Sequence, residues 1–108
     1  MTPPLIPFDI TGLRPDKGAP PAERVVSGKP ESLTWNLFTS PDGKFFSGFW
    51  ESGPGAWRIH YTEHEFCHIL EGVSIIKADD GTEMTVRAGD AFVIPAGFKG
   101  TWEVVERT

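Results

Sequence analysis

The chain has 108 residues with a single cysteine, and its formal net charge at pH 7 is -5. This length predicts one domain that folds without disulfides, and a chain with a single cysteine cannot form an internal disulfide bond. An acidic chain without a basic cluster is unsuited to nucleic acid, and no apolar run is long enough to span a membrane. Since the N-terminus carries no signal-peptide pattern, we expect a cytoplasmic protein.

Prolines punctuate the first third of the chain, where they occur at Pro3, Pro4, Pro7, Pro15, Pro20, Pro21 and Pro30. Proline lacks a backbone donor and restricts its predecessor, so long helices are not expected there. We interpret residues 1–33 as a proline-rich N-terminal arm. Within it we expect an edge strand near residues 5–10, at most one helical turn at 20–24, and a short strand at 25–28.

From residue 34 the pattern is one of short strands separated by turns. Turn signals such as Pro41-Asp42-Gly43 and Asp79-Asp80-Gly81 separate runs that are rich in β formers. The expected strands cover residues 34–39, 44–51, 56–61, 65–70, 73–78, 82–87, 91–94 and 100–107. Short strands at this spacing, without a helical pattern, predict an all-β barrel or sandwich.

The stretch from Gly53 to Gly72 holds most of the side chains suited to chemistry. All three histidines of the chain fall within it, namely His60, His64 and His68. Three acidic residues accompany them: Glu63, Glu65 and Glu71. This density is typical of a metal site, an acid–base site or a polar sheet surface.

Alternation along the strand that begins near Trp57 leaves two orientations open. Trp57, Ile59 and Tyr61 share one face, and Arg58 and His60 share the other. Periodicity alone favours the aromatic face in the core and the polar face in water. In the opposite orientation, Arg58 and His60 line an interior pocket.

Two segments resemble the two motifs of the cupin superfamily. The first is His60 followed by Glu65 and then, after six intervening residues, by Gly72; the second is Gly89-Asp90-Ala91-Phe92-Val93-Ile94-Pro95-Ala96-Gly97. With these motifs aligned, residues 34–108 are similar to a small single-domain cupin of the ureidoglycine aminohydrolase-like and ethanolamine-utilisation-type subfamily. The resemblance implies an RmlC-like jelly-roll barrel of two antiparallel sheets with an internal pocket.

The resemblance also implies a metal position, because metal-binding cupins supply three histidines and one glutamate from the two motifs. The corresponding positions here are Arg58, His60, Glu65 and Gly100. Glycine has no side-chain ligand, and arginine is a permanent cation that repels a metal ion. We therefore expect no metal and no other cofactor, or at most a divalent ion held weakly by His60 and Glu65.

The same alignment turns Arg58, His60 and Glu65 toward one pocket with Trp102 on its wall. We adopt this orientation because two separate motifs agree on it, although an ion pair between Arg58 and Glu65 would also explain both residues. A cation beside an indole suits a small carboxylate, and Gly100 leaves space where a histidine would stand.

We therefore expect a small-molecule-binding cupin with a degenerate metal site and unproven activity. The alternative is a ureidoglycine aminohydrolase-like enzyme acting on a small polar acid with a weakly held divalent metal, and a scaffold cupin is a third class. In the adopted orientation Trp57, Ile59 and Tyr61 need cover from the arm or from a second subunit, together with Phe66 and Leu70. Closed two-fold assemblies are the commonest, so we expect a homodimer.

Overall fold

The computed structural model of the chain describes residues 2–108 and is built of β-strands with one turn of 3-10 helix. The elements in chain order are β1 (Asp16–Gly18), η1 (Ala22–Arg24), β2 (Val25–Gly28), β3 (Ser32–Thr39), β4 (Phe46–Ser52), β5 (Gly55–His60), β6 (Glu65–His68), β7 (Val73–Ala78), β8 (Glu83–Arg87), β9 (Ala91–Ile94) and β10 (Lys99–Glu106). Each strand expected beyond residue 34 is present, so the all-β prediction is confirmed. The part of the chain that the structure describes has no helix able to cross a membrane.

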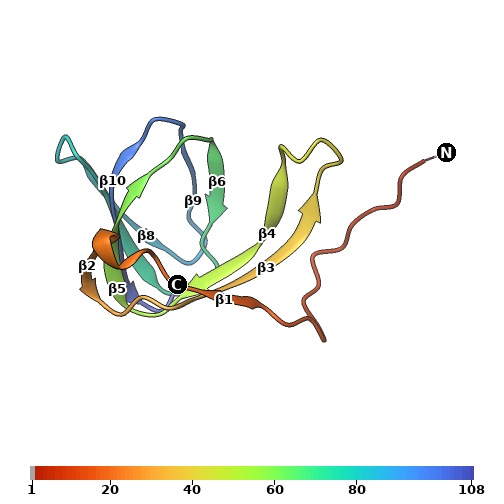
Figure 1. The fold of residues 1–108 in the computed structure, drawn as a ribbon, viewed down its shortest axis with the longest axis horizontal. Coiled ribbons are helices and arrows are strands. Elements are labelled where there is room, and N and C mark those ends of the chain that lie inside the picture. Colours follow the sequence, from red (N-terminus) through yellow and green to blue (C-terminus); the bar gives the residue numbers. More distant parts are fainter. Residues whose placement is uncertain (1) are drawn as a thin grey trace.

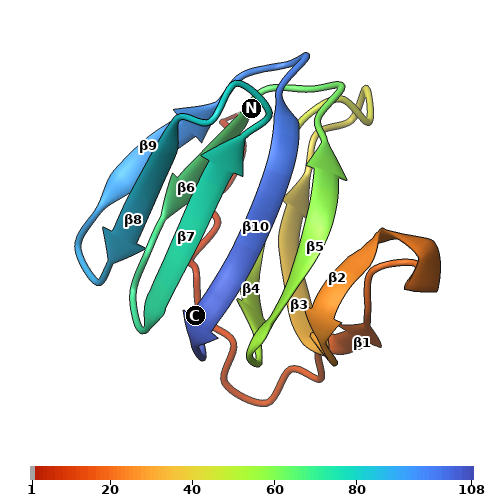
Figure 2. The same cartoon turned by 90° about the vertical axis from the view of Figure 1, so that its left-hand side faces the viewer.

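The strands pair into antiparallel sheets that form the two walls of a barrel. One wall is a five-stranded sheet in the order β2-β5-β10-β7-β8, seen face-on in Figure 2. The other wall consists of the sheet β1-β3-β4 and the pair β6-β9, which lie behind the five-stranded sheet in that view. This arrangement agrees with the expected jelly-roll barrel of two antiparallel sheets.

The core lies between the two walls and is made of residues at alternating strand positions. Its buried members are Ile59, Ile69, Ile76, Val86, Ile94, Trp102 and Val104. Partly buried side chains pack against this cluster: Trp57, Tyr61, Cys67, Phe92 and Phe98. Because a strand places successive side chains on opposite faces, a full set of alternate residues turns inward together.

A chain of hydrogen bonds crosses the core from β10 to β7 and the C-terminal residue. Trp102 Nε1 donates to Ser74 Oγ at 3.2 Å, and Ser74 Oγ lies 2.6 Å from Thr108 Oγ1. Since the Thr108 hydroxyl donates to the carbonyl oxygen of Glu106, Ser74 is the donor to Thr108. The fully buried Ser74 hydroxyl is therefore satisfied on both sides.

The N-terminal third is only partly a free arm. β1 pairs with β3 and β2 pairs with β5, so both belong to the barrel walls. The helical turn expected at 20–24 and the strand at 25–28 are present as η1 and β2, whereas the edge strand expected near residues 5–10 is absent from the described residues. The segment before β1 projects beyond β3 and β4, on their side away from β6 and β9 (Figure 1).

Candidate functional site

A cavity of about 340 Å³ lies beside β5, where the pairing of β2 with that strand ends. β2 pairs with β5 from Gly55 to Trp57, and among the described residues no strand continues along the same edge. The cavity is lined by three parts of the chain, namely the segment before β2, the paired strands β3 and β4, and the end of β5. Its lining residues are Ala19, Pro20, Pro21, Arg24, Ser32, Trp50, Ser52, Trp57, Arg58, Ile59, His60 and Tyr61.

Indole rings form the apolar side of this cavity. Trp50 lies with its ring centroid 6.0 Å from that of Trp57 and 5.5 Å from that of Trp102. Trp57 and Trp102 stack nearly parallel at 6.3 Å, which fills the space between them. Trp102, the expected wall residue, is thus buried behind the two indoles that border the cavity. Such rigid aromatic surfaces favour a ligand with a flat apolar body.

Basic side chains form the polar side of the cavity. Arg24 comes from η1, while Arg58 and His60 come from the end of β5. Of the described residues that line the cavity, none is Asp or Glu. Arg24 thus places a cation in the lining, although the chain as a whole is acidic.

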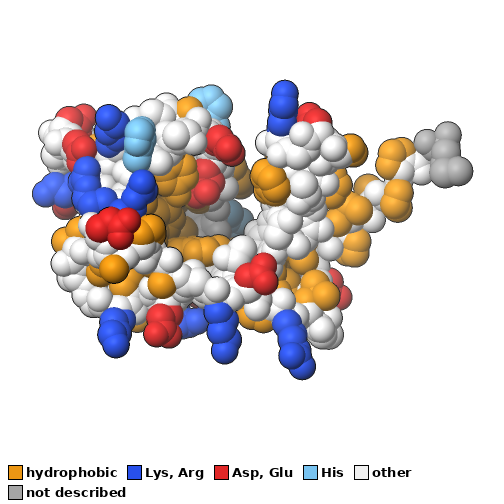
Figure 3. All heavy atoms as spheres, in the orientation of Figure 1, with side chains coloured by type: hydrophobic (Ala, Val, Ile, Leu, Met, Phe, Trp, Pro, Cys, Tyr) orange, Lys and Arg blue, Asp and Glu red, His pale blue; other side chains and the backbone are white. Residues whose placement is uncertain are grey.

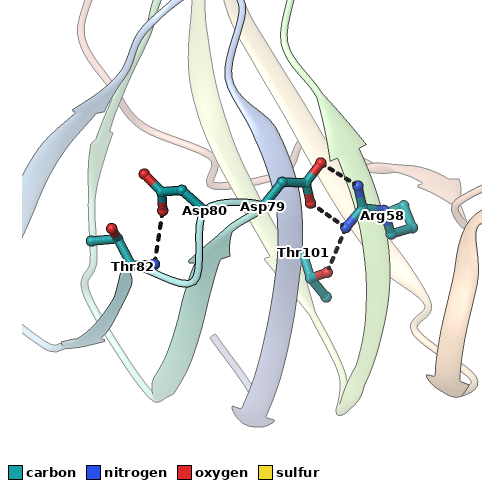
Figure 4. A network of polar contacts seen from close by, with 5 residues as sticks. All are labelled: Arg58, Asp79, Asp80, Thr82 and Thr101. Atoms are coloured by element: carbon teal, nitrogen blue, oxygen red, sulfur yellow. Dashed lines mark hydrogen bonds and ion pairs between the residues drawn. The ribbon is translucent and has the colours of Figure 1, made fainter.

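The side chains of Arg58 and His60 lie on the outer face of β5, so the prediction that they point to one interior volume with Glu65 is wrong. Arg58 forms a two-point ion pair with Asp79, with Nη1–Oδ1 at 2.7 Å and Nη2–Oδ2 at 2.9 Å, and Nη1 also contacts Thr101 Oγ1 at 3.3 Å (Figure 4). Arg58 and Asp79 are 46% and 49% exposed. The ion pair holds the pKa of Asp79 below its ordinary value.

The physical reason for this orientation is the cost of burial. Trp57, Ile59 and Tyr61 alternate with the two basic residues, and their face packs into the core of the same chain. Burying an aliphatic side chain such as that of Ile59 contributes about 1.5–3 kcal/mol, whereas an unpaired buried guanidinium is strongly unfavourable. The expectation that this aromatic face needs cover from the arm or a second subunit is therefore also wrong.

Glu65 lies on the same face of β6 as Cys67, where it is exposed and accepts hydrogen bonds from two neighbouring side chains. Tyr61 OH donates to Glu65 Oε1 at 2.9 Å, and Cys67 Sγ donates to the same oxygen at 3.1 Å. Burial, followed by the negative charge of Glu65, raises the pKa of Tyr61; burial and the hydrogen bond to Glu65 raise the pKa of Cys67. Both groups keep their protons at neutral pH. The ion pair between Arg58 and Glu65 is not formed, because each has other partners.

The residues considered as metal ligands do not converge. Across residues 2–108 no three His, Cys, Asp or Glu side chains come together in a way that would hold a metal ion. His60 faces outward, whereas Glu65 is bonded to the inward Tyr61. His64 Nδ1 accepts a hydrogen bond from the backbone N–H of Ala96 at 3.0 Å and so anchors the turn before β10. These residues do not fit the histidine-rich site of metal-binding cupins.

Gly100 does not leave the space that we expected. It is buried in β10, paired with Ile59 on one side and Ala78 on the other. A Cβ atom built at Gly100 would overlap the backbone carbonyl oxygen of Lys77 and press on the ring of Phe98. The glycine is therefore required by close packing, and a histidine would not fit there.

Several cavity residues were missed by sequence reasoning, namely Arg24, Ser32, Ser52 and Tyr61. Tyr61 could have been predicted from the sequence, because the alternation along this strand already placed its side chain on the apolar face. It also lies only four residues before Glu65. Arg24 offered no such signal, since it comes from a helical turn whose place beside β5 depends on the tertiary pairing of β2.

A five-stranded wall opposed by two smaller sheets, with an aromatic-lined cavity at one edge, is the architecture of a cupin-type jelly-roll barrel. The chain belongs to the EutQ-like cupin domain family, whose match covers residues 39–108. A comparison with proteins of curated function gives no match.

Solved structures similar to this chain carry the same fold. A DUF861 family protein from Thermotoga maritima is 31% identical over 54% of this chain and 66% of its own, with a TM-score of 0.52. A DUF861 family protein of unknown function from Pseudomonas syringae is 24% identical, with 93% of this chain and 43% of its own covered and a TM-score of 0.81. The Clostridium difficile EutQ protein is 23% identical over 72% of this chain and 62% of its own, with a TM-score of 0.63. The chain thus spans between 43% and 66% of the length of these proteins.

Proposed function

We propose that this protein binds a small carboxylate with a flat apolar body in the cavity beside β5. The observation that carries the proposal is the lining itself, which joins basic side chains to indole surfaces and includes no described acidic residue. A volume of about 340 Å³ suits a ligand of metabolite size.

Arg24 is the residue that we assign to the ligand's carboxylate. Its guanidinium takes part in no ion pair with another described residue, so its planar fork of donors is available for two-point contact with a carboxylate. Arg58 borders the cavity from β5, but its fork is engaged by Asp79. Arg58 and His60 therefore border the cavity without being assigned to the carboxylate.

The indoles of Trp50 and Trp57 give the cavity its preference for planar ligands. Trp50 keeps 38% of its surface exposed although it packs against two other indoles, so its remaining surface can be covered by a ligand. Stacking on a preformed aromatic surface costs little side-chain entropy. An aromatic carboxylate such as benzoate should therefore bind more tightly than acetate.

Isothermal titration calorimetry with acetate and benzoate tests this proposal. We expect Arg24→Ala to weaken benzoate binding by about 10-fold or more, because a hydrogen-bonded charge pair is lost. Arg14→Ala is the matched control, since Arg14 is also an exposed arginine of the N-terminal third but does not line the cavity, and it should change the affinity by less than about two-fold. Equal effects of the two substitutions, or no binding by the unaltered protein, would reject the proposal.

An enzyme acting on the same class of ligand is the second candidate. It is favoured by Tyr61, which lines the cavity and whose hydroxyl donates to the Glu65 carboxylate, so that a phenol of the lining is linked to a proton acceptor outside it. The ureidoglycine aminohydrolase-like activity considered above would need this pair to act without the metal site of other cupins. A turnover assay that is lost in Tyr61→Phe while binding is retained would favour the enzyme.

A further inference from the structure

The end of β5 that borders the cavity has an open edge. β2 pairs with β5 only as far as Trp57 and then diverges from it with η1 (Figure 2), so among the described strands only β10 accompanies the end of β5. Hydrophobic side chains and basic groups lie side by side on the surface of the barrel body (Figure 3). Backbone N–H and C=O groups along an open strand edge are a template for another extended chain.

The backbone of His60 points to this open edge, and the hydrogen bonds of its neighbours fix that direction. Tyr61 N–H donates to the carbonyl oxygen of Phe98 at 2.9 Å, so Tyr61 turns its backbone groups toward the turn before β10. Lys99, the partner of His60 on β10, turns its carbonyl toward β7, where it accepts from Asp79 N–H at 3.0 Å. Since successive residues of a strand direct their backbone groups to opposite edges, the N–H and C=O of His60 both face the cavity side.

The opposite wall of the cavity does not satisfy these two groups. That wall includes Pro20 and Pro21, which have no N–H to donate, and the Pro21 carbonyl already accepts a backbone hydrogen bond from η1 at 2.9 Å. The side chains of Arg58 and Tyr61 beside His60 bond to other partners. A ligand that carries its own amide groups would therefore complete the edge of β5 at His60.

The register of β2 sets the direction of a peptide that would add to this edge. β2 runs antiparallel to β5, with Val25 opposite Trp57. A peptide that continues the row of β2 beside β5 therefore runs from His60 toward Trp57, and its C-terminal end meets Arg24, the residue before Val25. Because the Arg24 guanidinium forms no ion pair with another described residue, it suits the terminal carboxylate of such a peptide.

The same pairing fixes where the side chains of the peptide point, since cross-strand partners share a face of the sheet. The residue opposite His60 exchanges two hydrogen bonds with it and turns its side chain to the outer face. The next residue, which is the last, lies opposite Ile59 and turns inward, to the side where the indoles of Trp50 and Trp57 border the cavity. Such rigid aromatic surfaces favour a flat apolar side chain.

We propose that the ligand of this cavity is the C-terminal end of an extended peptide whose last residue is aromatic. The proposal rests on the carboxylate site assigned to Arg24 above and adds the peptide backbone to what is recognised. The residue before the last pairs with His60, the last side chain contacts the indoles, and the terminal carboxylate meets Arg24. Pairing with a strand edge is independent of side chains, so the aromatic residue and the free carboxylate determine which peptides bind.

Isothermal titration calorimetry of the full chain tests this recognition with acetylglycylphenylalanine and phenylpropanoate, which share a ring and a carboxylate. We expect the peptide to bind at least about ten-fold more tightly, because it adds two hydrogen bonds with His60. Equal affinities would overturn the peptide inference and leave the carboxylate site standing. Absence of binding by both compounds and by benzoate would overturn the carboxylate site as well.

The carboxamide of the same peptide tests its direction. Without the terminal negative charge, binding should weaken by about ten-fold or more, because the charge-assisted contact with Arg24 is lost. In Arg24→Ala, the acid and the carboxamide should bind with similar affinities, since the two changes remove the same contact. A carboxamide that binds the unaltered protein as tightly as the acid would overturn the assigned direction.

Two ester analogues of the peptide distinguish strand pairing from a general gain in contact. An ester in place of the first amide removes the glycine N–H that faces the His60 carbonyl, and it should weaken binding by about five-fold or more. The matched control has an ester in place of the second amide. It removes the phenylalanine N–H, which points away from β5, and should change the affinity by less than about two-fold. Equal losses would overturn the pairing.

Amide hydrogen exchange measured by NMR locates the contact on the protein. We expect exchange at the His60 N–H to slow at least about ten-fold with saturating acetylglycylphenylalanine and to stay unchanged with phenylpropanoate. The Tyr61 N–H, which is already bonded to the Phe98 carbonyl, is the internal control and should not respond. An unchanged His60 N–H in the peptide complex would overturn the proposal.

Discussion

At the scale of single residues, Glu65 links two neighbouring side chains through the two hydrogen bonds that it accepts. Tyr61 and Cys67 both donate to its Oε1 atom, and both are held in the protonated form by burial and by the carboxylate. A thiol in this setting is a weak nucleophile at neutral pH, because only the thiolate reacts. Cys67 is therefore a packing residue and a donor rather than a reactive group.

The reactivity of Cys67 should depend on Glu65. We expect alkylation by iodoacetamide at pH 8 to be at least about ten-fold slower than for free cysteine, because a rise of one pKa unit removes about nine-tenths of the thiolate. Glu65→Gln removes the negative charge that holds the proton and should accelerate alkylation several-fold. Mass spectrometry of the time course gives both rates. Glu63→Gln, a change at an exposed acid in the preceding turn, is the control and should leave the rate unchanged.

At the scale of strands, a one-residue slip separates the predicted site from the observed one. The turn residues fixed the position of each strand well enough for all of those beyond residue 34 to be predicted. The motif alignment, however, took the five-residue step from His60 to Glu65, whereas the inward residue is Tyr61, four residues before Glu65. Since side chains alternate along a strand, this choice reversed both faces of β5.

The hydrophobic alternation of β5 favoured the observed orientation, so the face of this strand that packs into the core could be predicted from the sequence. The cavity could not be predicted from the sequence, because its lining joins residues from β3, β4, β5 and the turn before β2. Their juxtaposition depends on which strands are neighbours in the two walls. Local pattern carries no information on that pairing, and it also did not reveal that the carbonyl of Lys77 occupies the space beside Gly100.

The glycine of β10 should be intolerant of any side chain. Gly100→Ala places a methyl group against the Lys77 carbonyl of the neighbouring strand, and overpacking of this kind costs about 1–3 kcal/mol of unfolding free energy. Gly18→Ala is the matched control in β1, where a Cβ would meet only Ser32 Oγ at 3.4 Å, an ordinary contact. Urea unfolding of the two variants measures the difference. A Gly100→Ala protein as stable as Gly18→Ala would show that β7 yields easily at this point.

At the scale of the whole molecule, the stability of the barrel should fall at alkaline pH. The chain has one tyrosine and one cysteine, and both have folded-state pKa values above their ordinary values of 10.0 and 9.0. Below pH 9 both are protonated whether folded or unfolded, so their contribution to stability is fully present. As the pH rises further, the unfolded chain releases these protons while the folded chain retains them, and the contribution is lost.

Urea unfolding midpoints between pH 8 and pH 11 measure this loss. We expect the midpoint of the unaltered protein to decline from about pH 9 and more steeply from about pH 10. The double variant Tyr61→Phe and Cys67→Ala should show a flatter profile above pH 9, although its stability at pH 8 is lower through the loss of two hydrogen bonds. Parallel profiles for the two proteins would contradict the assignment of these groups.

The order of strands in the five-stranded wall also bears on how the chain comes to be folded. β10 lies between β5 and β7, and among the described strands it alone joins the β2–β5 and β7–β8 halves of that sheet. Because β10 follows both neighbours in the sequence, each half leaves the ribosome with an unpaired edge and waits for residues 99–106 before the wall can close. Such long-range closure slows folding, and open edges invite pairing with other chains in the interval. Nascent copies of this protein are therefore most vulnerable to aggregation just before β10 emerges.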